Sequence, residues 1–206
     1  RINISEIKIN AQYFSALCAL ELTNQDAEDL FLRFIRQHPE SSKTKQAYFQ
    51  VGKSYFNQAK YSEALNWFTK VSSIDLVGKE EIEYKFKTAY SYLETEDYAS
   101  AKPLFNMVKD TKSPYAEQAT YYYAYIAYLD KEYPNALKHF EKLKDSKNYE
   151  ESYPYYISAI YFLDKRYDDV LNYILPIINT TKQKHETEIF RIIAASYFAK
   201  EDYNNS

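Results

Sequence analysis

The sequence predicts an all-α fold built from repeated pairs of antiparallel helices. The first observation is a tyrosine that returns at spacings of 37, 35, 34 and 36 residues along the chain of 206 residues. These tyrosines are Tyr61, Tyr98, Tyr133, Tyr167 and Tyr203. The second observation is that small and apolar residues surround each of them at constant offsets. A period in this range is typical of solenoid proteins, in which each supersecondary unit buries a face of its neighbour.

The constant offsets mark positions where helices pack together. A small residue stands nine positions before each tyrosine, in order Gly52, Ala89, Ala124, Ser158 and Ala194. Three positions after the tyrosine come Ala64, Ala101, Ala136 and Val170, and seven positions after it come Phe68, Phe105, Phe140 and Ile174. Small residues allow the close backbone approach that packed helices need. The tyrosine has a fixed place at the turn into each second helix, so we interpret it as a packing residue.

Residues 45–76 are the clearest copy of the repeated unit. Apolar residues at three- and four-residue steps predict one helix that extends as far as Phe56. Ala59, Lys60 and Tyr61 interrupt those steps, and a second helical pattern follows from Ala64 to Val71. The unit is therefore predicted to be a hairpin of two short helices, which gain most of their stability by stacking on neighbouring hairpins.

The residues of this unit resemble the tetratricopeptide repeat. The matching pattern is Tyr48-x-x-Val51-Gly52-x-x-Tyr55 followed by Ala64-x-x-x-Phe68. The resemblance implies a right-handed superhelical solenoid of about five repeats and a truncated sixth, as one domain over residues 1–206 of a longer repeat protein. The approximate repeats are 8–44, 45–81, 82–116, 117–150, 151–186 and 187–206. In the first repeat Asn24 takes the place of the recurring tyrosine.

Composition argues against several classes of function. The chain has only 2 glycines, too few for the Gly-rich loops that hold phosphate groups. Its formal net charge of −3 and its pI near 5.7 lack the basic footprint of a nucleic-acid-binding protein. No apolar run approaches the roughly 20 residues that a membrane helix needs. We therefore expect no nucleic acid as a partner and no membrane insertion by this segment.

The sequence also lacks a recognisable catalytic or metal-binding set. Cys18 is the single cysteine, which rules out an internal disulfide and a cysteine-based metal site. His38, His139 and His185 fall in three separate repeats. No nucleophile, base and orienting partner can be recognised together. We expect a protein that is not an enzyme and that holds no cofactor or metal.

The family resemblance further implies where a partner binds. In tetratricopeptide repeats the first helices line the concave face of the superhelix, and an inward stripe of side chains contacts the ligand. Carried onto this sequence, that stripe comprises Phe49, Lys53, Phe86, Tyr90, Tyr121, Tyr125, Tyr128 and Tyr155. Aromatic rings provide large contact areas, and tyrosine adds a hydroxyl group.

An aromatic groove of this kind predicts a non-catalytic scaffold that binds a segment of a protein or peptide partner. The alternative is a module that binds glycans or cell-wall fragments, because aromatic rings also stack on sugar faces. A further alternative, that many of these rings only pack between helices, stays open at this stage. The sequence does not predict the oligomeric state.

A narrower resemblance concerns the first two repeats. The pattern Phe31-x-x-Phe34-Ile35-x-x-His38-Pro39 is similar to repeats of bacterial outer-membrane assembly lipoproteins and of the Tol-Pal coordinator protein. The excess of Lys over Arg and the abundance of Tyr, Ile and Asn indicate an AT-rich bacterial genome. Together they favour a periplasmic or envelope-associated location, with the cytoplasm as the alternative.

Overall fold

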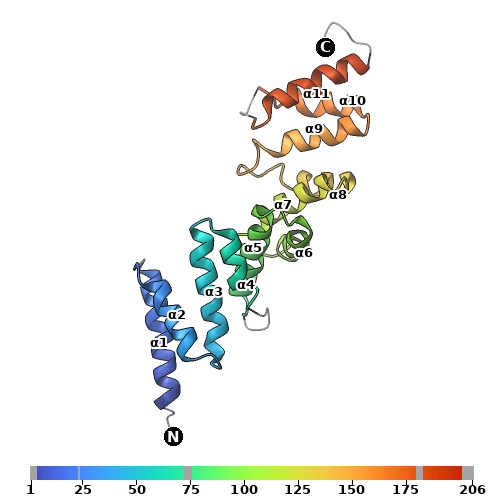
Figure 1. Cartoon of the computed structure of the whole chain (residues 1–206). Coiled ribbons are helices and arrows are strands. Elements are labelled where there is room, and N and C mark those ends of the chain that lie inside the picture. Colours follow the sequence, from blue (N-terminus) through green and yellow to red (C-terminus); the bar gives the residue numbers. More distant parts are fainter. Residues whose placement is uncertain (1–3, 23, 72–75, 180–182, 201–206) are drawn as a thin grey trace. The chain divides into compact units, whose positions relative to one another are not determined.

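A computed structural model describes residues 4–22, 24–71, 76–179 and 183–200 of the chain (Figure 1). Within these ranges the regular secondary structure is helical, as the sequence predicts. The helices are α1 (Ile4–Glu21), α2 (Ala27–Gln37), α3 (Ser42–Asn57), α4 (Tyr61–Phe68), α5 (Lys79–Glu94), α6 (Tyr98–Val108), α7 (Ala116–Leu129), α8 (Tyr133–Glu141), α9 (Tyr153–Leu163), α10 (Tyr167–Ile174) and α11 (Glu186–Ala199). Tyr203 and the end of the predicted sixth repeat lie outside the described residues.

The helices gather into two compact units, which we name the N-terminal unit (Arg1–Val108) and the C-terminal unit (Lys109–Ser206). Consecutive helices pair as hairpins in both units. The N-terminal unit contains α1–α2, α3–α4 and α5–α6, and the C-terminal unit contains α7–α8, α9–α10 and then α11. A single domain over residues 1–206 stays a prediction.

The recurring tyrosine is the first residue of the second helix in four hairpins. It opens α4 as Tyr61, α6 as Tyr98, α8 as Tyr133 and α10 as Tyr167. In three of them its ring contacts the aromatic residue five positions earlier, with centroid distances of 5.6 Å to Phe56, 5.9 Å to Tyr128 and 5.7 Å to Phe162. The interpretation of this tyrosine as a packing residue is confirmed in these three hairpins.

The turn before each of these tyrosines has the same backbone conformation. Its left-handed residues are Ala59, Glu96, Lys131 and Lys165, with φ of 57°, 61°, 62° and 58°. In the α3–α4 turn the Lys60 amide donates to the Tyr55 carbonyl at 3.0 Å, and the Ala59 amide donates to the Phe56 carbonyl at 2.9 Å. Equivalent pairs of bonds occur in the other three turns. This Schellman arrangement satisfies the last carbonyls of each first helix and redirects the chain into the second.

Three first helices begin three or four residues before the predicted repeats. α1 starts at Ile4, α3 at Ser42 and α5 at Lys79, whereas the repeats were placed at 8, 45 and 82. For α3 the cause is a helix cap: the Ser41 side chain accepts a hydrogen bond from the Lys43 amide at 3.2 Å. A serine cap of this kind satisfies a free amide and stabilises the first turn.

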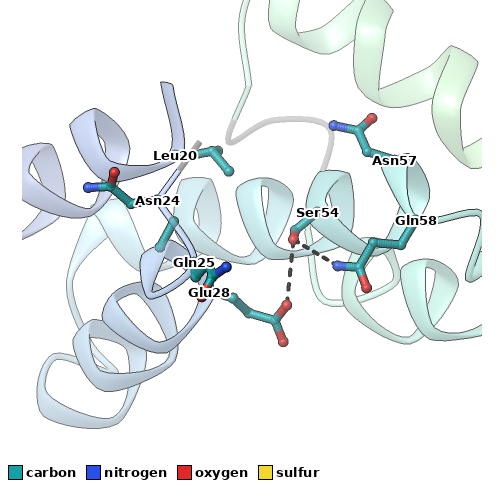
Figure 2. A pocket seen from close by; sticks show the side chains of 8 residues that line it. Leu20, Asn24, Gln25, Glu28, Ser54, Asn57 and Gln58 are labelled. Carbon is teal, nitrogen blue, oxygen red and sulfur yellow. Dashed lines mark hydrogen bonds between the residues drawn. The ribbon is translucent and has the colours of Figure 1, made fainter. Parts of the chain in front are cut away.

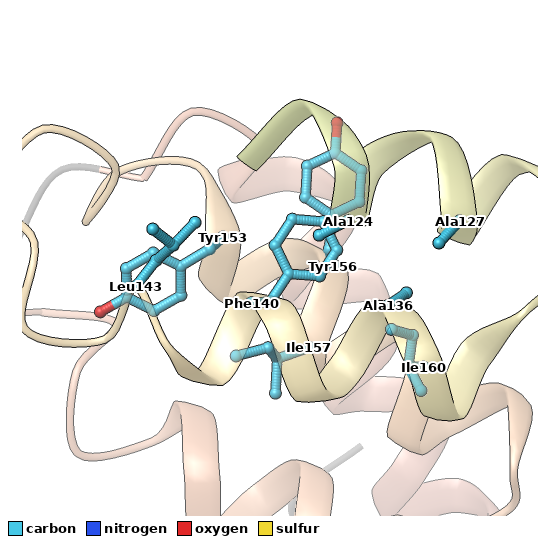
Figure 3. Close-up of a cluster of buried hydrophobic side chains, with 9 residues drawn as sticks. All are labelled: Ala124, Ala127, Ala136, Phe140, Leu143, Tyr153, Tyr156, Ile157 and Ile160. Atoms are coloured by element: carbon cyan, nitrogen blue, oxygen red, sulfur yellow. The ribbon is translucent and has the colours of Figure 1, made fainter. Parts of the chain in front are cut away.

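The core of each unit lies between its hairpins. In the C-terminal unit Ala124 of α7, Phe140 of α8, and Ile157 and Ile160 of α9 belong to one buried cluster (Figure 3). The large residues seven positions after the recurring tyrosine are fully buried in both units. They are Phe68, Phe105, Phe140 and Ile174. The register of the repeat therefore determines which residues form the core.

Candidate functional site

Five tyrosines from two helices of the C-terminal unit gather around one ring. Tyr121, Tyr125 and Tyr128 lie on one side of α7, and Tyr155 and Tyr156 lie on α9. The buried Tyr156 ring is edge-on to the other four, with centroid distances of 6.4, 5.8, 5.2 and 5.1 Å to Tyr121, Tyr125, Tyr128 and Tyr155. We name these five residues the tyrosine cluster. It brings together all four of the predicted groove residues of this unit.

Two rings from connecting segments also border the tyrosine cluster. Tyr149, in the connection between α8 and α9, stacks on Tyr121 with centroids 4.6 Å apart and planes 19° apart. His185, directly before α11, lies 4.5 Å from the Tyr155 ring. The sequence pattern predicts neither contact, because both residues lie in connections where the repeat leaves no helical spacing to read.

Burial favours the neutral phenol at three members of the tyrosine cluster, Tyr121, Tyr128 and Tyr156. Burial raises the pKa of Tyr128 to about 12, and the neighbouring Tyr155 hydroxyl adds to the shift. Burial also raises the pKa of Tyr121 and Tyr156 above the usual range of a phenol. All members of the cluster except Tyr156 are half-buried, so they offer part of their surface to solvent. The cluster presents apolar ring area together with hydroxyl groups, a combination common at protein interfaces.

Phe49 and Phe86 lie in the core of the N-terminal unit. Their exposed fractions are 0% and 4%. The Phe49 ring contacts Phe68 at 6.0 Å and Tyr84 at 5.8 Å, and the Phe86 ring contacts Phe105 at 6.0 Å. Both rings are thus covered by side chains of the chain itself, and a partner would have to displace those side chains to reach them. We therefore leave both rings out of the proposed binding surface.

The other two predicted residues of this unit belong to a half-buried group on α3 and α5. Glu83 lies 3.2 Å from the Lys53 ammonium and 3.9 Å from that of Lys87. The Lys87 nitrogen stands 4.1 Å from the Phe56 ring centroid, and the Tyr90 ring lies 5.7 Å from the same ring. We name Lys53, Phe56, Glu83, Lys87 and Tyr90 the lysine–aromatic patch. The resemblance implied roles for Lys53 and Tyr90 but named neither Glu83 nor Lys87.

Charge in the lysine–aromatic patch is only partly balanced. Burial lowers the pKa of Lys87, an effect that the nearby Glu83 carboxylate opposes. Two lysines share one carboxylate, so the patch carries a positive charge beside aromatic rings. Such a surface favours an acidic or carbonyl-rich segment over a basic one.

A polar pocket of about 340 Å³ opens elsewhere in the N-terminal unit (Figure 2). The Ser54 hydroxyl donates to the Glu28 carboxylate at 3.5 Å, and the Gln58 amide donates to Ser54 at 3.3 Å. Asn24 and Asn57 add further amide groups to the lining. No sequence motif marks this pocket, because its amides come from the α1–α2 connection and from the end of α3 and share no common spacing.

The three histidines have separate surroundings. His38 Nε2 lies 2.6 Å from the Gln12 side-chain oxygen, and His139 Nδ1 lies 2.8 Å from the Asn135 carbonyl. Burial lowers the pKa of His139, which favours its neutral form.

Across the described part of the chain, no three His, Cys, Asp or Glu residues are grouped so that they could hold a metal ion. Among the described residues, no helix is both long enough and apolar enough to cross a bilayer.

Comparison with known proteins points to one fold. No protein-family model matches the chain, and no curated protein matches it. A tetratricopeptide repeat protein from Parabacteroides merdae ATCC 43184 aligns with a TM-score of 0.63 and 16% identity over 94% of this chain and 74% of that chain. The MamA RS-1 ArsTM double mutant aligns with a TM-score of 0.58 and 16% identity, covering 94% of this chain and 97% of its own.

A putative kinesin light chain from Podosopora anserina, with nearly identical TPR-like repeats, aligns with a TM-score of 0.55 and 11% identity over 80% of this chain and 90% of that chain. Identities this low show a shared fold and no more. The narrower resemblance to Tol-Pal and outer-membrane assembly repeats, and the envelope location, stay predictions. The helix hairpins, their identical turns and these structural neighbours together show that the chain has the tetratricopeptide-repeat fold.

Proposed function

We propose that this chain is a non-catalytic scaffold that binds a segment of a partner protein. The tyrosine cluster of the C-terminal unit is the main contact surface in this proposal, and the lysine–aromatic patch of the N-terminal unit is a second one. The observation that carries the proposal is the set of four half-buried tyrosines held around the buried ring of Tyr156.

Preorganisation favours binding at the tyrosine cluster. The Tyr156 ring stacks on Phe140 with centroids 5.0 Å apart and planes 4° apart, which ties the centre of the cluster to the core. Rings that are already held in place lose little conformational freedom when a partner binds. Their exposed ring surface suits apolar or proline side chains, and their hydroxyl groups can donate hydrogen bonds to backbone carbonyls.

A peptide library displayed on phage and selected against the purified chain tests this proposal. Selected peptides are then titrated against variants by fluorescence anisotropy. We expect Tyr125→Ala and Tyr155→Ala each to weaken binding about 10-fold or more, equivalent to about 1.4 kcal/mol, because each removes a central aromatic anchor. Tyr197→Ala is the matched control, since Tyr197 is a half-buried tyrosine of α11 outside the cluster.

The outcomes separate the possible sites. If Lys53→Ala and Tyr90→Ala abolish binding while Tyr125→Ala and Tyr155→Ala leave it unchanged, the binding site is the lysine–aromatic patch of the N-terminal unit. Unchanged binding in both sets of variants, with circular dichroism showing native helix content, would refute the proposal. Titration with soluble cell-wall fragments tests the glycan alternative, which predicts binding that the same tyrosine variants abolish.

A further inference from the structure

The polar pocket of the N-terminal unit lies where the first hairpin departs from the repeat. In the second hairpin the recurring tyrosine, Tyr61, opens α4, and its ring reaches the next first helix with a centroid distance of 5.6 Å to Tyr90. The first hairpin has Asn24 at this position. Because α2 begins only at Ala27, Asn24 and Gln25 belong to the connection, and both line the pocket (Figure 2). We name this cavity the Asn24 pocket.

The walls of the Asn24 pocket are mostly polar. Its lining side chains that carry hydrogen-bonding groups are Asn24, Gln25, Glu28, Ser54, Asn57 and Gln58. An apolar ligand would leave these groups without partners, which costs free energy. The lining residues include no aromatic ring on which a sugar face could stack. The pocket therefore suits a polar ligand that makes several hydrogen bonds.

Glu28 is the single charged residue of this lining. Its carboxylate accepts a hydrogen bond from the Ser54 hydroxyl at 3.5 Å and another from the Tyr55 hydroxyl, which raises the pKa of Tyr55. Within the described ranges Glu28 takes part in no ion pair. The nearby Lys60 ammonium donates to the Gln58 side-chain oxygen at 2.8 Å instead. The carboxylate would repel an anionic ligand, and it has no cationic partner of its own.

We propose that the Asn24 pocket binds the guanidinium group of an arginine side chain from a partner protein. A guanidinium has five N–H donors in one plane and no acceptor. The Glu28 carboxylate can accept two of these hydrogen bonds side by side, and the side-chain oxygens of Asn24 and Asn57 are further acceptors of the lining. A lysine ammonium has fewer donors and binds as a point charge, so it would leave more of these oxygens unpaired. This inference rests on the proposed function, because that function supplies the partner segment.

Capped amino acids test the pocket apart from any partner. The probe is Nα-acetyl-arginine N-methylamide, titrated into the isotope-labelled full chain, and the shifts of backbone amides in NMR spectra give the dissociation constant. The control ligand is Nα-acetyl-citrulline N-methylamide, whose urea group has the shape of a guanidinium but no charge. We expect the arginine compound to bind about 10-fold or more tightly than the citrulline compound, because its hydrogen bonds to the carboxylate are charge-assisted.

Substitutions identify the binding site. Glu28→Gln removes the charge and keeps a side chain of similar shape, so the preference for the arginine compound should disappear. Asn24→Tyr restores the recurring tyrosine, whose ring is expected to occupy the pocket and to weaken the arginine compound about 10-fold or more. Asp29→Asn is the matched control, since Asp29 is an exposed carboxylate of α2 next to Glu28 but does not line the pocket. The control should leave both affinities unchanged.

Several results would overturn the proposal. One is the absence of saturable shifts with the arginine compound, and another is an equal affinity for the arginine and citrulline compounds. A third is an arginine preference that persists in Glu28→Gln together with an affinity that persists in Asn24→Tyr. A fourth is an equal loss of affinity in Asp29→Asn and Glu28→Gln, which would reduce the effect to the general charge of this surface. Circular dichroism confirms that each variant keeps its native helix content.

Failure of the proposed function gives a different result. Tyr125→Ala and Tyr155→Ala should leave the affinity for the arginine compound unchanged, because both tyrosines belong to the C-terminal unit. Binding of this compound, without any peptide selected against the chain, would support the pocket and count against the scaffold function. Peptides that bind the tyrosine cluster, without any binding of the arginine compound, would overturn the pocket and leave the scaffold function supported.

Discussion

Gly52 on α3 lies so close to the Phe68 ring on α4 that a Cβ atom at position 52 would stand 2.5 Å from two of the ring carbons. Cβ atoms do not approach other atoms that closely, so this contact requires glycine. The two residues occupy repeat positions nine before and seven after Tyr61. Their contact explains why a small residue faces a large one in this hairpin.

Replacing this glycine is expected to destabilise the N-terminal unit. In Gly52→Ala the Phe68 ring must move, which should cost about 2–3 kcal/mol. The better helix propensity of alanine offsets about 1 kcal/mol of this cost, so the free energy of unfolding should fall by about 1–2 kcal/mol. Urea unfolding followed by circular dichroism measures the difference.

A double-mutant cycle provides the control for this prediction. Phe68→Leu shortens the side chain opposite position 52, so the loss in the double variant should be smaller than the sum of the single losses. A Gly52→Ala variant as stable as the original chain would show that the helices can separate without loss.

The left-handed turn residues predict a stabilising substitution. Lys131→Gly should raise the free energy of unfolding by roughly 0.5–1 kcal/mol. Glycine adopts the φ of 62° at this position without steric strain. The relief of that strain exceeds the cost that glycine adds through its larger entropy in the unfolded chain. Lys138→Gly is the matched control, since Lys138 is an exposed lysine inside α8. The control should lower the free energy of unfolding by about 1 kcal/mol. Equal effects of both substitutions would contradict this account of the turn.

The tyrosine cluster predicts a loss of stability at alkaline pH. The folded-state pKa of Tyr128, about 12, lies above the ordinary value of 10, so the fold favours the neutral phenol. This contribution to stability is fully present below pH 10 and is lost as the pH rises through about 12. Urea unfolding at pH 8 and pH 11 measures it, with tyrosinate absorbance recorded in parallel. Tyr128→Phe should show a shallower fall of stability with pH, and an unchanged slope would remove Tyr128 as a cause.

A further prediction concerns the Glu83 carboxylate, which lies near two lysines of the lysine–aromatic patch. Glu83→Gln leaves Lys53 and the half-buried Lys87 near each other without their counter-charge. We expect the free energy of unfolding to fall by about 0.5–1 kcal/mol, and by less at high salt because exposed parts of the patch are screened. Asp169→Asn is the control, since the Arg166–Asp169 pair is more exposed. A larger fall in the free energy of unfolding for Asp169→Asn than for Glu83→Gln would contradict a stabilising role of the shared carboxylate.

Local pattern was sufficient to predict the helix hairpins. The interruption at Ala59, Lys60 and Tyr61 marked the turn, although Tyr61 already belongs to α4 as its first residue. The left-handed turn itself had no sequence signal, because alanine, glutamate and lysine occupy positions where glycine is usual. The early start of α3 depends on a serine cap that lies outside the repeated pattern.

The sequence by itself determined the repeat, its register and the all-α fold, because apolar spacing and turn positions are local properties of the chain. Only the tertiary structure decided which rings are accessible. Phe49 and Tyr121 occupy the same repeat position, twelve residues before Tyr61 and Tyr133. Phe49 is fully buried against Tyr84 of the next hairpin, whereas Tyr121 stays half-buried beside Tyr149 of a connecting segment. Burial depends on which neighbouring element covers a ring, and a repeat pattern read along one helix does not contain that information.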